Sequence, residues 1–87
     1  MDAFNVRLTT SARKDVRKLK QQLLERVAAR LQALALNPFP PQAEKLSQRD
    51  EYRLRVGDYR IVYEVDKRGR IVTIHRIRHR REVYRKL

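Results

Sequence analysis

The chain of 87 residues contains no cysteine, no tryptophan and only two glycines. The absence of cysteine excludes disulfide bonds and thiolate metal sites. Two isolated glycines cannot build a glycine-rich loop of the kind that cradles phosphates. No apolar run approaches the roughly 20 residues that a membrane span needs, and the first residues lack the apolar core of a signal peptide. We therefore expect a single cytoplasmic domain over residues 1–87 with no membrane contact.

Acidic residues are also scarce. The chain has 10 Asp and Glu but 22 Lys and Arg, so its net charge is +12. A charge of this size on so short a chain indicates an anionic partner, such as nucleic acid, the ribosome or an acidic protein. The acidic residues are scattered and form no paired carboxylates, so we expect neither a metal nor a cofactor. Any chemistry would then come from Arg, Lys, Tyr and His side chains.

The most informative stretch is residues 52–63, in which two alternating apolar runs flank Gly57-Asp58. Such a pattern predicts a β-hairpin, with strands over residues 51–56 and 59–65 and a type II′ turn that starts at the glycine. The predicted cross-strand pairs on the core side are Val56 with Tyr59, Leu54 with Ile61 and Tyr52 with Tyr63.

The opposite face of this hairpin carries Arg53, Arg55 and Arg60. Arg55 is predicted to lie directly across from Arg60, and like charges that face each other on a sheet are destabilising by roughly 0.2–1 kcal/mol. Guanidinium groups bind phosphate oxygens in a bidentate manner. The three arginines therefore predict a phosphate-binding face.

The segments before the hairpin predict a strand and helical structure. Residues 4–9 alternate with Phe4, Val6 and Leu8 inward, and Thr10 or Ser11 is expected to cap the following helix. A helical apolar stripe then extends from Ala12 to Ala35 and ends before Asn37-Pro38. The spacing alone does not separate one long helix from two shorter ones.

After the hairpin, a last strand is predicted over residues 71–78, with Val72 and Ile74 in the core and Thr73 and His75 on the face of Arg55 and Arg60. Together the elements predict an α+β domain, in which helices cover one face of an antiparallel sheet and the other face is open and basic.

The available residue types suit one reaction on RNA, in which the 2′-hydroxyl attacks the adjacent phosphate. The substrate brings its own nucleophile, so the protein has only to orient it, stabilise the phosphorane and move protons. Arginine stays protonated in proteins and is no proton acceptor. Histidine titrates near pH 6.5, which leaves His75 or His79 open as an acid–base group.

Three segments, Lys45-Leu46, residues 52–63 and the tail with His79-Arg80 and Val83-Tyr84, resemble the RelE/ParE superfamily of toxins from type II toxin–antitoxin modules. The resemblance spans nearly the whole chain. It implies a first strand, a two-helix hairpin broken near residues 19–22, and a three-stranded antiparallel meander with the helices on one sheet face. It also implies a RelE-like endoribonuclease, an mRNA interferase that cleaves the message in the ribosomal A site and so inhibits translation.

The resemblance also implies roles for individual residues. Arg53 and Arg55 would contact the message or assist proton transfer, at positions where the best-studied members carry lysine. Arg60 would bind the scissile phosphate. The remaining implied site residues are Arg80, on the leaving side, and Tyr84, which would stack on or orient the scissile nucleotide. The spacing of the tail leaves Arg78 as an alternative to Arg80.

The implied partners are the ribosome, its mRNA and a cognate acidic, RelB-like antitoxin, through which the toxin–antitoxin complex would bind operator DNA. Two other functions stay open at this stage. The chain could be a ParE-like inhibitor of DNA gyrase without nuclease activity, or a non-toxic relative that only binds an antitoxin or nucleic acid.

Overall fold

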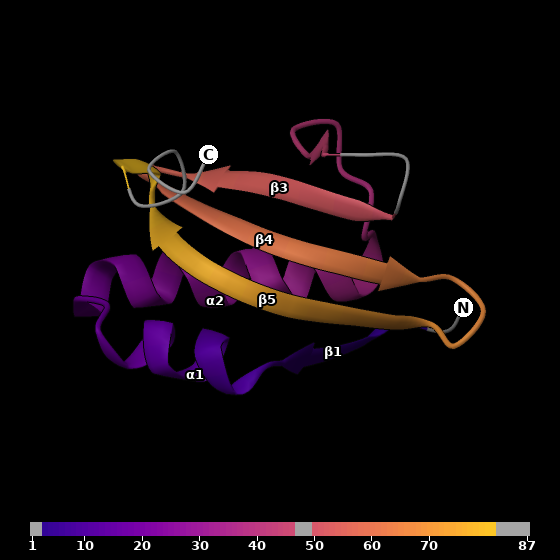
Figure 1. The fold of residues 1–87 in the computed structure, drawn as a ribbon, viewed down its shortest axis with the longest axis horizontal. Coiled ribbons are helices and arrows are strands. Elements are labelled where there is room, and N and C mark those ends of the chain that lie inside the picture. Colours follow the sequence, from indigo (N-terminus) through magenta and orange to yellow (C-terminus); the bar gives the residue numbers. More distant parts are fainter. Residues whose placement is uncertain (1–2, 47–49, 82–87) are drawn as a thin grey trace.

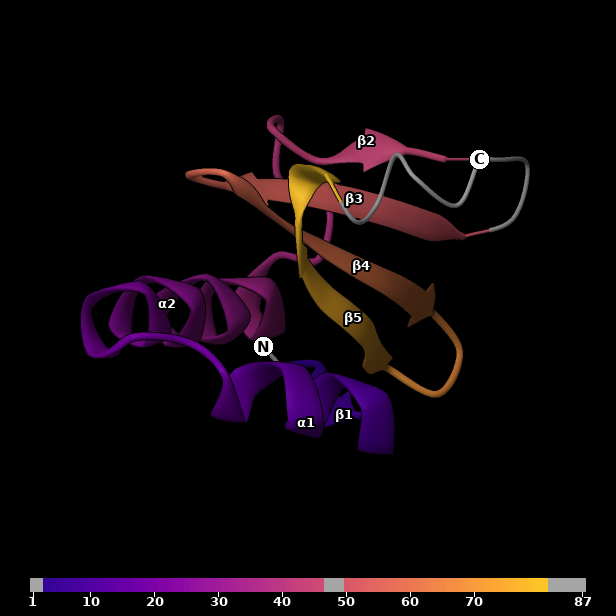
Figure 2. The same ribbon diagram turned by 60° about the vertical axis from the view of Figure 1, so that its left-hand side comes forward.

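The computed structural model describes residues 3–46 and 50–81, and it forms one five-stranded sheet with two helices. The elements are β1 (Asn5–Leu8), α1 (Thr10–Arg17), α2 (Gln21–Leu36), β2 (Glu44–Lys45), β3 (Glu51–Val56), β4 (Tyr59–Asp66) and β5 (Ile71–His79). Both helices lie on the same side of the sheet (Figures 1 and 2), which confirms the α+β class and the helical hairpin. No helix in these described ranges is long and apolar enough to cross a membrane.

The strands follow the order β1-β5-β4-β3-β2, and the sheet is mixed. β3, β4 and β5 form the predicted antiparallel meander. The expectation of a wholly antiparallel sheet is wrong, because β1 runs parallel to β5, with Val6 beside Val72. The chain between β1 and β5 contains both helices and the strands β2, β3 and β4, and a parallel pair requires such a long connection.

The start of α1 differs by one residue from the prediction. Thr9, and neither Thr10 nor Ser11, caps the helix, and its hydroxyl accepts a hydrogen bond from the Ala12 N–H at 3.0 Å. The reason is that β1 already ends at Leu8, which frees Thr9 to adopt the cap conformation. The predicted break between the helices and the end of α2 before Asn37 are both confirmed.

The core lies between the helices and the inner face of the sheet. Its buried side chains are Ala12, Val27, Leu34, Leu54, Val56, Ile61, Tyr63, Val65, Val72, Ile74 and Ile77. The Tyr63 hydroxyl donates a hydrogen bond to the carbonyl of Pro38 at 2.8 Å, so the phenol ties the segment after α2 to β4. Burial, assisted by the neighbouring Tyr52, raises the pKa of Tyr63 to about 12.

The β3–β4 hairpin has the predicted register, with Leu54 opposite Ile61 and Arg55 opposite Arg60. Gly57 has a φ of +58°, whereas Asp58 keeps a negative φ, as a type II′ turn requires. Local sequence therefore specifies this hairpin fully.

A β-bulge interrupts the pairing of β4 with β5. Tyr63 lies opposite Ile74, but the next residue back, Val62, lies opposite Arg76, so His75 is an extra residue in β5. Strict alternation from Ile74 would turn Ile77 outward and Arg78 inward. The bulge reverses this order: Ile77 is buried with 2% exposure, and Arg78 faces Arg60 across the ladder.

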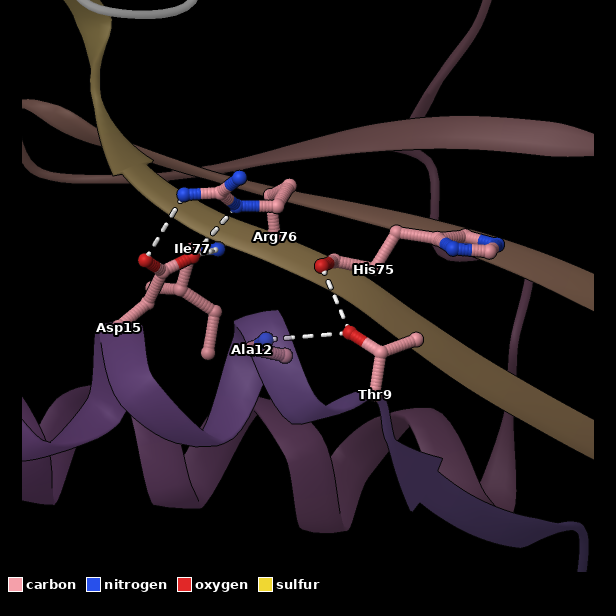
Figure 3. Close-up of polar contacts among 6 residues, drawn as sticks. All are labelled: Thr9, Ala12, Asp15, His75, Arg76 and Ile77. Carbon is pink, nitrogen blue, oxygen red and sulfur yellow. Dashed lines mark hydrogen bonds and ion pairs between the residues drawn. The ribbon is translucent and has the colours of Figure 1, made fainter.

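Side chains of the α1 region form hydrogen bonds with backbone groups at the edge of β5, beyond the end of β1 (Figure 3). The Thr9 hydroxyl donates to the carbonyl of His75 at 2.9 Å. The buried Asp15 carboxylate accepts the Ile77 N–H at 2.9 Å and two bonds from the Arg76 guanidinium at 2.9 and 3.1 Å. Burial acts to raise the pKa of Asp15, but the hydrogen bonds from Arg76 and Ile77 and the nearby arginine charges outweigh it and hold this pKa below its usual value.

Candidate functional site

Three arginines line up across the sheet on the face opposite the helices. Arg55 on β3 pairs with Arg60 on β4, and Arg60 pairs in turn with Arg78 on β5. We call these three residues the arginine row. Arg60, at the centre, is 8% exposed, and its Nη1 donates to the carbonyl of Tyr59 at 3.1 Å. A row of like charges is unfavourable by itself, so the row is suited to an anion that bridges its members.

A hollow of about 300 Å³ adjoins the row. Its lining residues are Gln42, Glu44, Arg53, Arg55 and Arg60. Glu44 on β2 lies opposite Arg53 on β3, and the two side chains form an ion pair with an Nη2–Oε1 distance of 2.6 Å. The structure thus brings Arg53, Arg55 and Arg60 around one concave surface.

The two candidates for the C-terminal arginine lie in different places. Arg78 belongs to the arginine row, whereas Arg80 follows the end of β5, where its N–H donates to the carbonyl of Asp58 at 2.7 Å. The exposed Arg80 side chain lines a separate hollow of about 440 Å³ together with Asp58 and His79. Tyr84 lies outside the described residues, so its role stays a prediction.

Neither histidine lines the hollow beside the arginine row. His75 is on the predicted open face, but its Nε2 lies 3.1 Å from Glu64 Oε1. Glu64 is four residues along β4 from Arg60, a separation of about 13 Å at the usual rise of a strand. His79 packs edge to face on Tyr59, with 5.4 Å between ring centroids. Residues 3–46 and 50–81 hold no group of three His, Asp or Glu side chains that could bind a metal ion.

Glu44 is the charged residue of this site that the sequence did not reveal. It belongs to a two-residue strand, which is too short to produce a recognisable alternation. The signal that could have located it is the pairing of β2 with β3, which places a carboxylate opposite Arg53.

Comparison with known proteins identifies the class of protein to which this chain belongs. Residues 6–84 match the family described as the ParE toxin of the type II toxin–antitoxin system, parDE. The chain belongs to this family of small protein toxins.

Individual relatives show which branch of this toxin family the chain is similar to. The chain is 33% identical to the toxin RelG of Mycobacterium tuberculosis, over 95% of this chain and 98% of RelG. It is 30% identical to a chain of the RelBE2 toxin–antitoxin complex from Mycobacterium tuberculosis, with a TM-score of 0.78 and coverage of 91% and 93%. The isolated RelE toxin of E. coli shares the fold at 21% identity, with a TM-score of 0.80 over 98% of this chain and 100% of that one. The protein is therefore a RelE-like toxin of a type II toxin–antitoxin system.

Proposed function

We propose that this toxin is a ribosome-dependent mRNA endonuclease, in which the 2′-hydroxyl of the message attacks the adjacent phosphate. The observation that carries the proposal is the arginine row. Three guanidinium groups on neighbouring strands face the same side of the sheet, and the central one, Arg60, is fixed by its own strand and is 8% exposed. Such a row is preorganised for a phosphate that gains negative charge during the reaction.

The geometry supports a division of roles along the row. Arg60 would bind the scissile phosphate, because it is the central and least exposed member. Arg55 and Arg53 would hold the nucleotide on the side of the hollow that they line. Arg78 would act on the leaving side, because it is the C-terminal arginine that faces Arg60. Arg80 stays the alternative to Arg78 for the leaving side, and Tyr84 keeps the role in stacking on or orienting the scissile nucleotide that the family resemblance implies.

The proposed partners follow from the reaction and from the relatives. A message held in the ribosome would be the substrate, which places the site of action in the cytoplasm. A cognate acidic antitoxin would inhibit the toxin, since related toxins have been solved in complexes with RelB-type antitoxins. The net charge of +12 suits both a polyanionic substrate and an acidic inhibitor. The toxin–antitoxin complex would bind operator DNA through the antitoxin.

Primer extension on a message in a purified translation system tests this function. The wild-type toxin should cut at A-site codons only when ribosomes are present. Arg60→Ala should reduce the cleavage rate by about 10²–10³-fold, the usual cost of removing one transition-state donor. Arg68→Ala, at an exposed position in the β4–β5 turn, is the matched control and should cut normally.

Circular dichroism shows whether a loss of cleavage by Arg60→Ala comes from unfolding. Arg60→Ala should retain the folded spectrum, because it removes one of several facing like charges. An intact message with folded wild-type toxin, or full cleavage by Arg60→Ala, would overturn the proposal.

The second candidate function is inhibition of DNA gyrase, which the ParE description of the matched family favours. A toxin of that kind would leave the message intact and block supercoiling by purified gyrase. A non-toxic relative would have no effect in either assay.

A further inference from the structure

We infer that Asp15, on α1, is a positioning residue that holds Arg78 in the arginine row, where Arg78 serves the leaving side of the cleavage. The inference rests on the proposed endonuclease function and deepens it. Arg78 faces Arg60 across the ladder, and two like charges in facing positions oppose this arrangement. The fold therefore has to hold Arg78 in the row by other contacts.

The bulge at His75 decides on which side of the sheet Arg78 lies. With the extra residue taken up at His75, Ile77 is buried and Arg78 lies opposite Arg60. If the two strands paired without the bulge, alternation from Ile74 would place Ile77 outward and Arg78 inward. A change of pairing by one residue would thus remove Arg78 from the row.

The segment of β5 after the bulge is held on one edge by α1. β1 pairs with β5 only as far as Leu8 and Ile74, and in the described part of the chain no strand continues along this edge. Beyond that point the Asp15 carboxylate accepts the Ile77 N–H at 2.9 Å (Figure 3). Asp15 therefore fixes the backbone of the residue directly before Arg78.

This hydrogen bond is specific for the bulged pairing. The carbonyl of Ile74 points toward β1, where it accepts the Thr9 N–H at 3.0 Å. Backbone groups of successive residues in a regular strand point to alternate edges. Without the bulge, the N–H of Arg76 rather than that of Ile77 would reach the edge beside α1. Because Asp15 accepts the N–H of Ile77, it stabilises the pairing that turns Arg78 outward.

The Asp15 carboxylate is itself held in place. It is 7% exposed, and its two oxygens accept bonds from the Arg76 guanidinium at 2.9 and 3.1 Å. Such a two-point contact fixes the plane of a carboxylate. Asp15, Ile77 and Arg78 also line one small hollow of about 100 Å³. The carboxylate, the backbone that it binds and the arginine that it positions are thus in one place.

In the proposed reaction Arg78 would stabilise the negative charge that develops on the leaving oxygen. The 2′-oxygen forms a bond to phosphorus and its proton goes to water. The bond from phosphorus to the 5′-oxygen of the next nucleotide breaks, and that oxygen takes a proton from water. A displacement of about 1 Å at such a catalytic group can slow a reaction by about 10²-fold. Asp15 is buried and acts only through Arg78.

Single-turnover cleavage of a ribosome-bound message, at a temperature at which circular dichroism shows each variant folded, tests the inference. Asp15→Ala should cut about 10–10²-fold more slowly than the wild type. Asp15→Asn should keep more of the rate, since its amide oxygen can still accept the Ile77 N–H. Tyr63→Phe is the matched control, because it loses another buried hydrogen bond, far from Arg78 in the sheet, and should cut normally.

A message with sulfur in place of the bridging 5′-oxygen at the cut site separates positioning from general damage. A thiol is a stronger acid than an alcohol, so sulfur carries the negative charge with less help. Asp15→Ala and Arg78→Ala should therefore both regain most of the wild-type rate on this message. On the ordinary message, Asp15→Ala should cause no further loss in an Arg78→Ala background. Asp15→Asn serves for the same comparisons if Asp15→Ala does not fold.

Three results would overturn the inference while leaving the endonuclease function intact. The first is an equal slowing of the Asp15 variant on both messages, which would make Asp15 a structural anchor only. The second is a further loss of rate in the Arg78→Ala background. The third is a wild-type rate for folded Asp15→Ala or for Arg78→Ala. A wild-type toxin that cuts no message would instead refute the proposed function itself.

Discussion

Removing the Asp15 carboxylate should destabilise the fold, because it anchors α1 to the edge of β5. In Asp15→Ala the buried Ile77 N–H loses its acceptor, which costs about 1–3 kcal/mol. Arg76 is 36% exposed and can regain water, so the ion pair contributes about 0–1 kcal/mol. The two contributions sum to about 1–4 kcal/mol, and we expect a loss near the middle of this range, about 2–3 kcal/mol. A domain of this size has a free energy of unfolding of roughly 4–13 kcal/mol, so the loss is a large fraction of its stability.

Urea unfolding followed by circular dichroism measures the effect. Asp15→Ala should show a lower midpoint with an unchanged slope, and its Tm should fall by roughly 10–20 °C. Asp15→Asn should lose only about 1 kcal/mol, because the amide oxygen can still accept the Ile77 N–H. If both variants unfold within about 0.5 kcal/mol of the wild type, the carboxylate is not the anchor that the structure indicates.

The pH dependence gives an independent check on the same residue. The pKa of Asp15 is held below its ordinary value of 3.8 in the folded state by the hydrogen bonds from Arg76 and Ile77, which outweigh burial. Between the folded and unfolded pKa values the unfolded chain binds more protons, so the stabilisation is present above about pH 4 and is lost as the pH falls further. Asp15→Asn should lack this acid-dependent component, and an identical acid unfolding profile in both proteins would contradict the assignment.

Two further substitutions test the fold. Tyr63→Phe leaves the buried carbonyl of Pro38 without its donor and should cost about 1–3 kcal/mol in urea unfolding. The stability of the wild type should also fall as the pH rises from about 10 toward about 12, because the unfolded chain loses the phenolic proton first, and the Phe variant should lack this component. Gly57→Ala places a side chain at a φ of +58° and should cost about 1–2 kcal/mol. A neutral Gly57→Ala would contradict the turn assignment.

The parts of the fold that the sequence predicted are those that short-range patterns determine. The strands around Gly57-Asp58 alternate cleanly, so the two-residue turn sets every pair from Val56–Tyr59 to Tyr52–Tyr63. Three arginines of the site therefore followed directly from the hairpin. The proline after Asn37 likewise marked the end of α2.

The parts that escaped prediction depend on contacts between distant segments. The parallel pairing of β1 with β5 joins strands more than 60 residues apart, and no local pattern specifies it. Asp15 resembles any polar residue on the surface of a helix until Ile77 is known to lie beside it. Glu44 can be assigned to the site only when its position opposite Arg53, in a strand of two residues, is known.

The bulge at His75 also affects how this chain should be compared with its relatives. The bulge absorbs the extra residue and keeps Ile77 inward and Arg78 outward, so the outward-facing residues after Ile74 cannot be found by counting alternate positions. A relative that kept this extra residue but paired its strands without the bulge would present an aliphatic side chain where this toxin presents Arg78. An alignment gap misplaced by one position would assign the arginine to the wrong column. The length of the last strand and its bulge therefore have to be matched together when the outward-facing residues of relatives are compared with those of this chain.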